Sequence, residues 1–256
     1  MMRRRWRRPA AWATLGVMAI YAGTTVGCRP MPPMGEEGEK AAERRSGSRP
    51  AFREFRHTDK TPEEWLALLS HRKPQVRDQA IDALVQYGAG QVPALRKVVR
   101  ETKSVDARVS AIRALSALGS AAQAAVPELV EACRAAEWDV RAAAAEALGM
   151  TGQGDPRATE ALCAALRDED AAVRAAAAKA LRKCGAAGPD VVALLAAALE
   201  DPDANVQSAA ADALGRLGAE ARSALPALEK ALQSAGPVAR VSIEEALKNI
   251  RAASTP

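Results

Sequence analysis

A repeat with a period of about 33 residues runs through most of the 256-residue chain and limits the folds that it can adopt. One position of the repeat, called the index position here, is arginine in all units but one. Its occurrences are separated by 31, 33, 33, 33 and 33 residues, and alanine and leucine follow it by six and seven residues every time. The index residues are Arg77, Arg108, Arg141, Arg174, Gln207 and Arg240. Such a period is typical of solenoids, in which each unit buries its apolar side against the next.

Each repeat predicts two antiparallel helices. Small and leucine residues three, six, seven and ten positions after the index residue share one face of a helix. Eleven positions after it stands a glycine in five units, where we expect the helix to end with a positive φ. A second helix follows, opened in three units by Pro93, Pro127 or Pro226, which suits a first helical turn. The glycines are Gly88, Gly119, Gly152, Gly185 and Gly218.

Composition and chain ends agree with this reading. Aromatic residues make up only 3% of the chain, and alanine runs replace the β-branched and aromatic residues that strands favour. We therefore predict an all-α protein, an α-solenoid of about five repeats with a capping half-repeat at each end. Thr61-Pro62-Glu63-Glu64 opens the first of these half-repeats as a capped helix start. The expected segments are residues 1–27, a tether at 28–60, the repeat domain at 61–252 and a tail at 253–256.

The segment from Asp139 to Gly149, Asp-Val-Arg-Ala-Ala-Ala-Ala-Glu-Ala-Leu-Gly, resembles the signature of short HEAT repeats of the phycobilisome-lyase-like type. Related segments surround Arg174 and Gln207. The resemblance implies an armadillo-like superhelix whose Val-Arg helices line the concave face. It does not define the activity, because that family includes scaffolds, lyase subunits and enzymes.

The N-terminus has the pattern of an export signal. Five arginines precede an uncharged, partly apolar stretch from Pro9 to Gly27, as in secretory signal peptides. The end of this stretch, Thr25-Val26-Gly27-Cys28, resembles a bacterial lipobox, although a lipobox usually has leucine where this chain has Thr25. The resemblance implies cleavage before a lipidated Cys28 and a membrane-anchored protein on the periplasmic or outer-membrane side. A plain transmembrane anchor and an ordinary signal peptide are the alternatives.

Residues 28–60 are predicted to form a flexible tether, because proline, glycine and mixed charges leave too few apolar residues to bury.

The basic excess of the chain lies entirely in the export signal. The formal net charge is +5, but removing the five N-terminal arginines leaves 31 basic and 31 acidic residues. A protein that binds nucleic acid needs a concentrated positive face. We therefore expect no nucleic-acid partner.

The residues needed for the chemistry of the related enzymes are missing. In the family that this chain resembles, hydroxylases bind two irons through repeated His-Glu pairs. This chain has two histidines, His57 and His71, and neither is followed by a glutamate. Ligands for a metal must also converge from several elements. A bilin would need an aromatic-lined pocket. We predict no metal, no cofactor and no catalytic residues, with an enzyme or lyase-like subunit completed by a partner as the alternative.

Two acidic clusters and three cysteines have structural interpretations. Asp168-Glu169-Asp170 and Glu200-Asp201-Pro202-Asp203 precede Val-Arg helices, where acids cap exposed amides; a calcium site is the alternative. Cys133, Cys163 and Cys184 fall at or beside core positions, where free cysteine behaves as a small hydrophobe. Export leaves a disulfide among them open.

A charged stripe lies five residues after the index positions. It consists of Asp82, Arg113, Glu146, Lys179, Asp212 and Glu245, and its charge alternates in sign through the first five members. One interpretation is a row of ion pairs between repeats. The other is a concave face without a large field of one sign, which favours a protein or peptide partner. We therefore predict a non-catalytic protein-binding scaffold.

Overall fold

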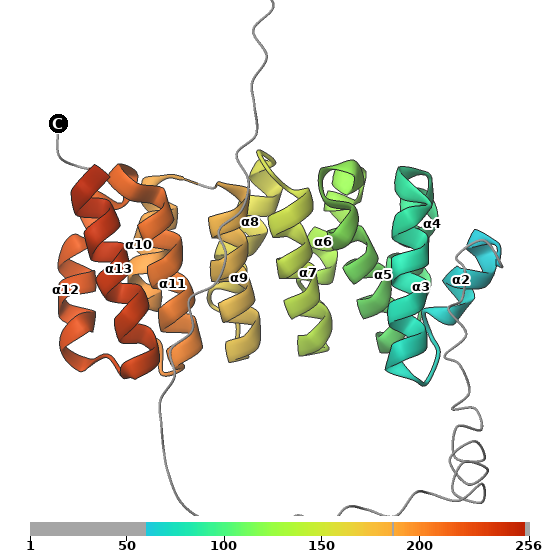
Figure 1. Cartoon of the computed structure of the whole chain (residues 1–256), viewed down its shortest axis with the longest axis horizontal. Coiled ribbons are helices and arrows are strands. Elements are labelled where there is room, and N and C mark those ends of the chain that lie inside the picture. The colour runs from blue at the N-terminus through green and yellow to red at the C-terminus, as the bar shows by residue number, and fades with distance from the viewer. Residues whose placement is uncertain (1–59, 186, 254–256) are drawn as a thin grey trace, which may run out of the picture. The chain divides into compact units, whose positions relative to one another are not determined.

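A computed structural model describes residues 60–185 and 187–253, in which all regular secondary structure is helical. Two layers of helices alternate along the chain (Figure 1). The index layer, which carries the index residues, consists of α3 (Pro74–Gln86), α5 (Val105–Leu118), α7 (Trp138–Thr151), α9 (Ala171–Cys184), α11 (Ala204–Leu217) and α13 (Pro237–Ala253). The second layer consists of α2 (Pro62–Leu68), α4 (Val92–Glu101), α6 (Val126–Ala132), α8 (Pro156–Ala165), α10 (Pro189–Ala198) and α12 (Leu225–Ser234). Three 3-10 turns, η2 (Gly88–Gln91), η3 (Gly119–Ala125) and η4 (Gly218–Ala224), connect the layers. The predicted all-α solenoid is confirmed.

The helix starts follow local sequence signals. Thr61 accepts from the amide of Glu64 while the Glu64 carboxylate accepts from the amide of Thr61, which is the capping box expected for α2. Proline occupies the first turn of α4, α6, α8, α10 and α12. Three of these prolines, Pro93, Pro127 and Pro226, are predicted from the sequence to open a helix. Pro156 and Pro189 are not, because each stands closer to the index residue of its own repeat.

The leucine seven positions after each index residue is buried in every repeat. Its exposed fraction is 0–1% in the first five repeats and 5% for Leu247 in the last. The alanine before it is at most 2% exposed. Burying one such leucine contributes roughly 1.5–3 kcal/mol, so the repeated leucines form the continuous core between the two layers.

Glycine lets neighbouring index-layer helices approach closely at two places. A Cβ on Gly149 of α7 would lie 2.8 Å from the Cα of Ala180 in α9, and one on Gly215 of α11 would lie 3.0 Å from the Cα of Ala246 in α13. Real side chains almost never approach backbone atoms that closely. The index-layer helices pack against one another more extensively than the second-layer helices do.

The expected positive φ at the end of each index helix is found in four repeats and is wrong for the third. Gly88, Gly119, Gly185 and Gly218 have φ between 57° and 76°, whereas Gly152 has φ −96°. In that repeat Gly154 takes the positive φ, 75°. Gly152 is required for a different reason: a Cβ there would lie 2.5 Å from the Cβ of Ala158 and 2.8 Å from the carbonyl oxygen of Leu148.

One described stretch, Val105–Ala132, has the length and hydropathy of a membrane-spanning helix. It comprises α5, η3 and α6, and it is interrupted at Gly119, whose φ is 59°, and at Ala122, whose backbone is not helical. The stretch is therefore two separate helices of the solenoid.

Candidate functional site

The charged stripe lies on the exposed side of the index layer. All six of its side chains are exposed. Arg113 makes an ion pair of 3.0 Å, but its partner is Asp78 of α3 rather than a member of the stripe. Among residues 60–185 and 187–253, no ion pair joins two stripe members. The stripe is thus a row of exposed side chains of which Arg113 is paired outside the row, and its members do not form the row of ion pairs with one another that was one interpretation of the sequence.

A hollow of about 250 Å³ lies on the index layer toward its C-terminal end. It contains Asp212 and Glu245, the two stripe members at which the alternation of charge stops. Arg182 and Arg216 line the same hollow, so opposite charges surround it. Gly215 lines its floor, where α11 and α13 approach closely.

The index residues themselves form a second polar array, at the start of the index helices. Each index helix begins three residues before its index residue. The index side chain folds back and donates to carbonyl oxygens of the turn that precedes its own helix. These bonds are Arg77 to His71 (2.9 Å), Arg108 to Thr102 (2.8 Å), Arg141 to Ala135 and Ala136 (3.0 and 2.8 Å), Arg174 to Asp168 and Glu169 (2.9 and 3.0 Å), Gln207 to Asp201 (2.7 Å) and Arg240 to Ala235 (3.4 Å).

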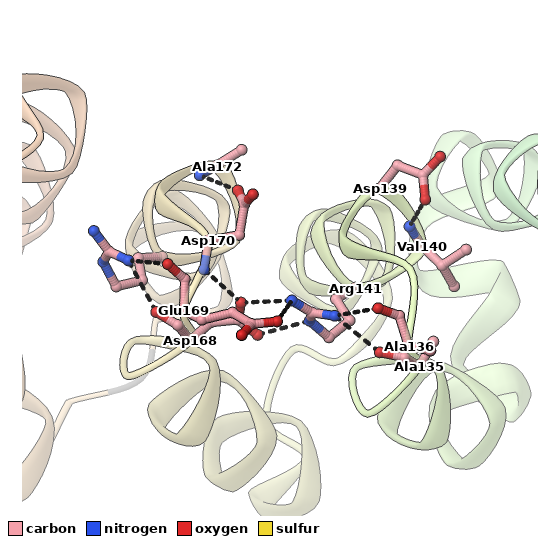
Figure 2. A network of polar contacts seen from close by, with 10 residues as sticks. Ala135, Ala136, Asp139, Val140, Arg141, Asp168, Glu169, Asp170 and Ala172 are labelled. Atoms are coloured by element: carbon pink, nitrogen blue, oxygen red, sulfur yellow. Dashed lines mark hydrogen bonds and ion pairs between the residues drawn. The ribbon is translucent and has the colours of Figure 1, made fainter.

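In the central repeats the same arginine also reaches the next helix pair. The Nε and Nη2 of Arg141 donate to the two oxygens of Asp168 at 2.8 and 2.9 Å (Figure 2). Arg174 binds Asp201 in the same way, at 2.7 and 2.9 Å. Because both partners are largely buried, each pair is a strong bidentate contact that joins successive repeats.

The acidic clusters have the predicted capping role and a further one. Asp170 accepts from the amide of Ala172 and caps α9, and Asp203 caps α11 through the amides of Asn205 and Val206. The first aspartate of each pattern, Asp168 or Asp201, faces the arginine of the preceding repeat. Sequence reasoning used the arginines only as markers of the period and missed this pairing; the recurring spacing of 27 residues between Arg141 and Asp168 and between Arg174 and Asp201 was the available signal.

The surroundings of these aspartates keep them ionised. Burial alone raises the pKa of Asp168, but the hydrogen bonds from Arg141 and from the Asp170 amide outweigh burial and hold the pKa below its usual value. Burial, the Arg174 hydrogen bond and the Asp203 amide act on Asp201 in the same directions, and its pKa is also lowered.

A third carboxylate is buried between second-layer helices. Glu128 of α6 accepts two hydrogen bonds from Arg96 of α4, at 3.0 and 2.8 Å, and one from Arg100 at 3.2 Å. Its side chain is 7% exposed. Burial raises the pKa of Glu128, and the hydrogen bond from Arg96 with the charges of both arginines more than offsets this, so that the pKa is lowered.

The remaining predicted sites are placed as follows. His71 accepts a hydrogen bond from the Lys73 amide through Nδ1. Cys133, Cys163 and Cys184 are partly exposed, and the Cys184 thiol donates to the carbonyl of Leu181 at 3.6 Å. Burial raises the pKa of the Cys133 thiol to about 12. Within the described part of the chain, no group of three or more His, Cys, Asp or Glu residues is arranged to hold a metal ion. Cys28 and His57, with the expected signal and most of the tether, lie outside the described residues.

Comparisons with known proteins bear on the whole array. The family described as HEAT repeats matches residues 62–149, 126–188 and 159–248. An engineered protein of known structure is 27% identical, with a TM-score of 0.55 over 75% of this chain and 97% of that one. A designed armadillo repeat protein in complex with the peptide (KR)4 is 18% identical, with a TM-score of 0.51 over 75% of this chain and all of that one. The karyopherin Kap121p bound to Ste12p is 16% identical, with a TM-score of 0.60, and the match covers 75% of this chain and 25% of that one. A search of curated proteins finds no match.

Proposed function

The chain belongs to the HEAT-repeat family, and on that premise we propose that it is a non-catalytic scaffold that binds a protein or peptide along the exposed side of the index layer. The observation that carries this proposal is the exposure of all six stripe side chains on successive parallel helices. A surface built from equivalent positions of stacked repeats is extended, as solenoid binding surfaces are.

Curvature and charge support this surface over the opposite one. In a curved stack of two layers, the helices of the inner layer pack more closely against one another than those of the outer layer. The index layer is the more closely packed of the two layers here. This difference in packing supports our proposal that the stripe lies on the concave side. Its mixed charges suit a partner with both basic and acidic groups. Two proteins of similar fold, the designed armadillo protein and Kap121p, are bound to a peptide and to Ste12p respectively.

Site-specific photo-cross-linking tests the proposed surface. A photo-reactive residue at Lys179, in the middle of the stripe, is expected to cross-link one recurring protein that mass spectrometry identifies. The same residue at Glu160, exposed on α8 of the second layer, is the matched control. Purified partner should then bind a Lys179→Glu variant at least several-fold more weakly. Equal cross-linking from both layers, or unchanged affinity of the variant, would rule out the index layer as the binding surface.

The alternative is an enzyme or lyase-like subunit completed by a partner. Metal analysis and absorption spectra of the purified protein distinguish the two: stoichiometric iron or a bound chromophore would exclude the scaffold. The scaffold is the better supported function, because the polar residues described above bind one another or line an open surface.

We propose further that the scaffold is exported and tethered to a bacterial membrane through a lipidated Cys28. The basis is the sequence of residues 1–28, an arginine-rich start followed by an apolar stretch and a lipobox-like exit. Residues 28–60 would then hold the repeat domain away from the membrane surface.

Labelling with a fatty-acid analogue tests this anchor. We expect Cys28→Ser to lose the label and to accumulate as an unprocessed precursor. Cys163→Ser, which removes a free cysteine of α8, should keep both the label and the processing. Labelling of the Cys28→Ser protein at the normal level would refute lipidation at Cys28 and leave a transmembrane anchor or an ordinary signal peptide as the alternatives.

A further inference from the structure

Arg141 and Arg174 bind an aspartate at the start of the next repeat, but Arg77 and Arg108 do not. Thr102 stands at that position for Arg77, whose Nη2 lies 3.3 Å from a carboxylate oxygen of Asp106 instead. Asp168 and Asp201 each stand six residues before the next index residue, and they bind Arg141 and Arg174. The equivalent residue for Arg108 is Ala135. Because alanine has no polar group, Arg108 lacks the carboxylate partner that the next two arginines have.

Arg108 is correspondingly short of partners. Its Nη2 donates to the carbonyl of Thr102 at 2.8 Å, whereas Arg141 and Arg174 use Nη1 for the equivalent bonds. Its Nη1 lies 3.9 Å from the nearest carboxylate oxygen, on Glu137, whose side chain is 42% exposed. Its Nε is buried and has no hydrogen-bond partner among the described residues. In Arg141 and Arg174 this same Nε donates to the aspartate at 2.8 and 2.7 Å.

A pocket of about 400 Å³ lies beside the Ala135 position. Both Arg108 and Ala135 line it, together with Arg100 and Arg134. Two acids also line it, but they are already paired: Glu128 with Arg96 and Arg100, and Glu131 with Arg134 at 3.8 Å. Among the described arginines of this pocket, Arg108 is the one with a buried Nε that has no hydrogen-bond partner.

We propose that this pocket binds the carboxylate of an aspartate or glutamate side chain from an acidic segment of the partner protein. The carboxylate would take the place that Asp168 and Asp201 take beside their arginines. Charge-assisted hydrogen bonds from the Arg108 guanidinium would recognise this carboxylate. A partner residue would thus complete the row of inter-repeat pairs between α5 and α7.

The proposal rests on the proposed function in one respect, that the ligand is a protein. The pocket, however, lies on a different surface from the stripe. The pocket is lined by residues of α4 and α6, by Arg108 at the start of α5 and by the turn before α7, and none of the stripe residues lines it. Cross-linking at Lys179 and carboxylate binding at Arg108 can therefore succeed or fail separately.

Nitrogen NMR of arginine side chains tests the pocket on the full-length chain. The probe is a tetra-aspartate peptide blocked at both ends, with tetra-asparagine as the uncharged control. The Nε–H signal of Arg108, assigned by its loss in Arg108→Gln, is expected to shift saturably with the aspartate peptide alone. The Nε–H signals of Arg141 and Arg174 should not shift, because these guanidinium groups are already bound to Asp168 and Asp201.

An aspartate built into the chain should compete with the peptide. In Ala135→Asp the Arg108 Nε–H signal should resemble those of Arg141 and Arg174 without peptide, and the affinity for the peptide should fall about tenfold or more. Ala219→Asp, which adds the same charge at an exposed position of η4, should bind as the wild type does.

An unmoved Arg108 signal in the wild type, or undiminished binding by Ala135→Asp, would overturn the proposal. Equal loss of affinity in Ala219→Asp would also overturn it, since the effect would then be one of net charge. Should Ala135→Asp fail to fold, Arg108→Gln takes its place in the affinity measurement, where normal peptide binding would contradict the assignment.

Discussion

The Arg141 guanidinium of α7 binds both carboxylate oxygens of Asp168, a residue of the following helix pair, at 2.8 and 2.9 Å. The same guanidinium donates to the carbonyls of Ala135 and Ala136 in the turn before its own helix. One side chain thus connects three points of the chain, which fixes the turn and the position of the next repeat together (Figure 2).

Removing this arginine is expected to destabilise the fold strongly. The side chains of Arg141 and Asp168 are 9% and 12% exposed. Arg141→Ala leaves a nearly buried carboxylate without its partner, which costs about 3–5 kcal/mol. Urea unfolding followed by circular dichroism measures the loss. Arg113→Ala is the control, because Arg113 also binds an aspartate, Asp78, but the two side chains are 59% and 52% exposed; its cost should stay within about 1 kcal/mol. Equal losses would show that the Arg141–Asp168 pair adds nothing beyond a surface ion pair.

Acid should destabilise the protein through Asp168 and Asp201. The pKa of each is lowered in the folded state, so each binds protons more weakly when folded than when unfolded. Their contribution is complete above the unfolded pKa of about 3.9 and is lost as the pH falls through the folded pKa. Urea midpoints between pH 7 and pH 3 should therefore fall less steeply in an Asp168→Asn, Asp201→Asn double variant. Asp212→Asn, on the exposed stripe, should keep the wild-type slope; a double variant with that same slope would contradict the prediction.

A single methyl group on Gly149 should separate α7 from α9. Alanine is favoured over glycine within a helix by about 1 kcal/mol, so propensity alone predicts that Gly149→Ala stabilises the protein. The added Cβ would lie 2.8 Å from the Cα of Ala180 and 2.9 Å from its Cβ. We expect this overlap to prevail, with a net loss of about 1–3 kcal/mol in thermal or urea unfolding. Gly90→Ala meets no atom within 4 Å and is expected to be neutral or stabilising. A Gly149→Ala protein at least as stable as wild type would show that the close approach is not required.

The register of the repeats can be tested by a buried and an exposed residue. Leu181 is 1% exposed and is flanked by complete repeats, so Leu181→Ala should cost about 2–5 kcal/mol. Glu146 is exposed on the stripe, and Glu146→Ala should change stability by no more than about 0.5 kcal/mol. Denaturant midpoints decide between the two positions, and a reversed order of effects would mean that the assigned faces are exchanged.

Much of the fold was predictable because its determinants are local. Leucines, alanines and prolines at fixed offsets define which face of each helix is apolar and where each helix begins, as Leu148 and Pro127 illustrate. The prediction of a positive φ was wrong at Gly152, because glycine is required there for space and not for its backbone conformation. A positive φ explains Gly119, whereas the side chain of Ala158 and the carbonyl of Leu148 leave no room for a Cβ at Gly152.

By itself, the sequence determined the all-α repeat architecture, the buried face of each helix and the exposure of the stripe, since a helix places residues on its faces by spacing alone. Only the tertiary structure decided which charges meet. Arg141 and Asp168 belong to different helix pairs, and their distance depends on how far one pair is shifted and rotated against the next. For the same reason Ala135 is unremarkable in the sequence. It becomes informative once the structure places it in a pocket beside Arg108, because the two following repeats hold an aspartate at the same position.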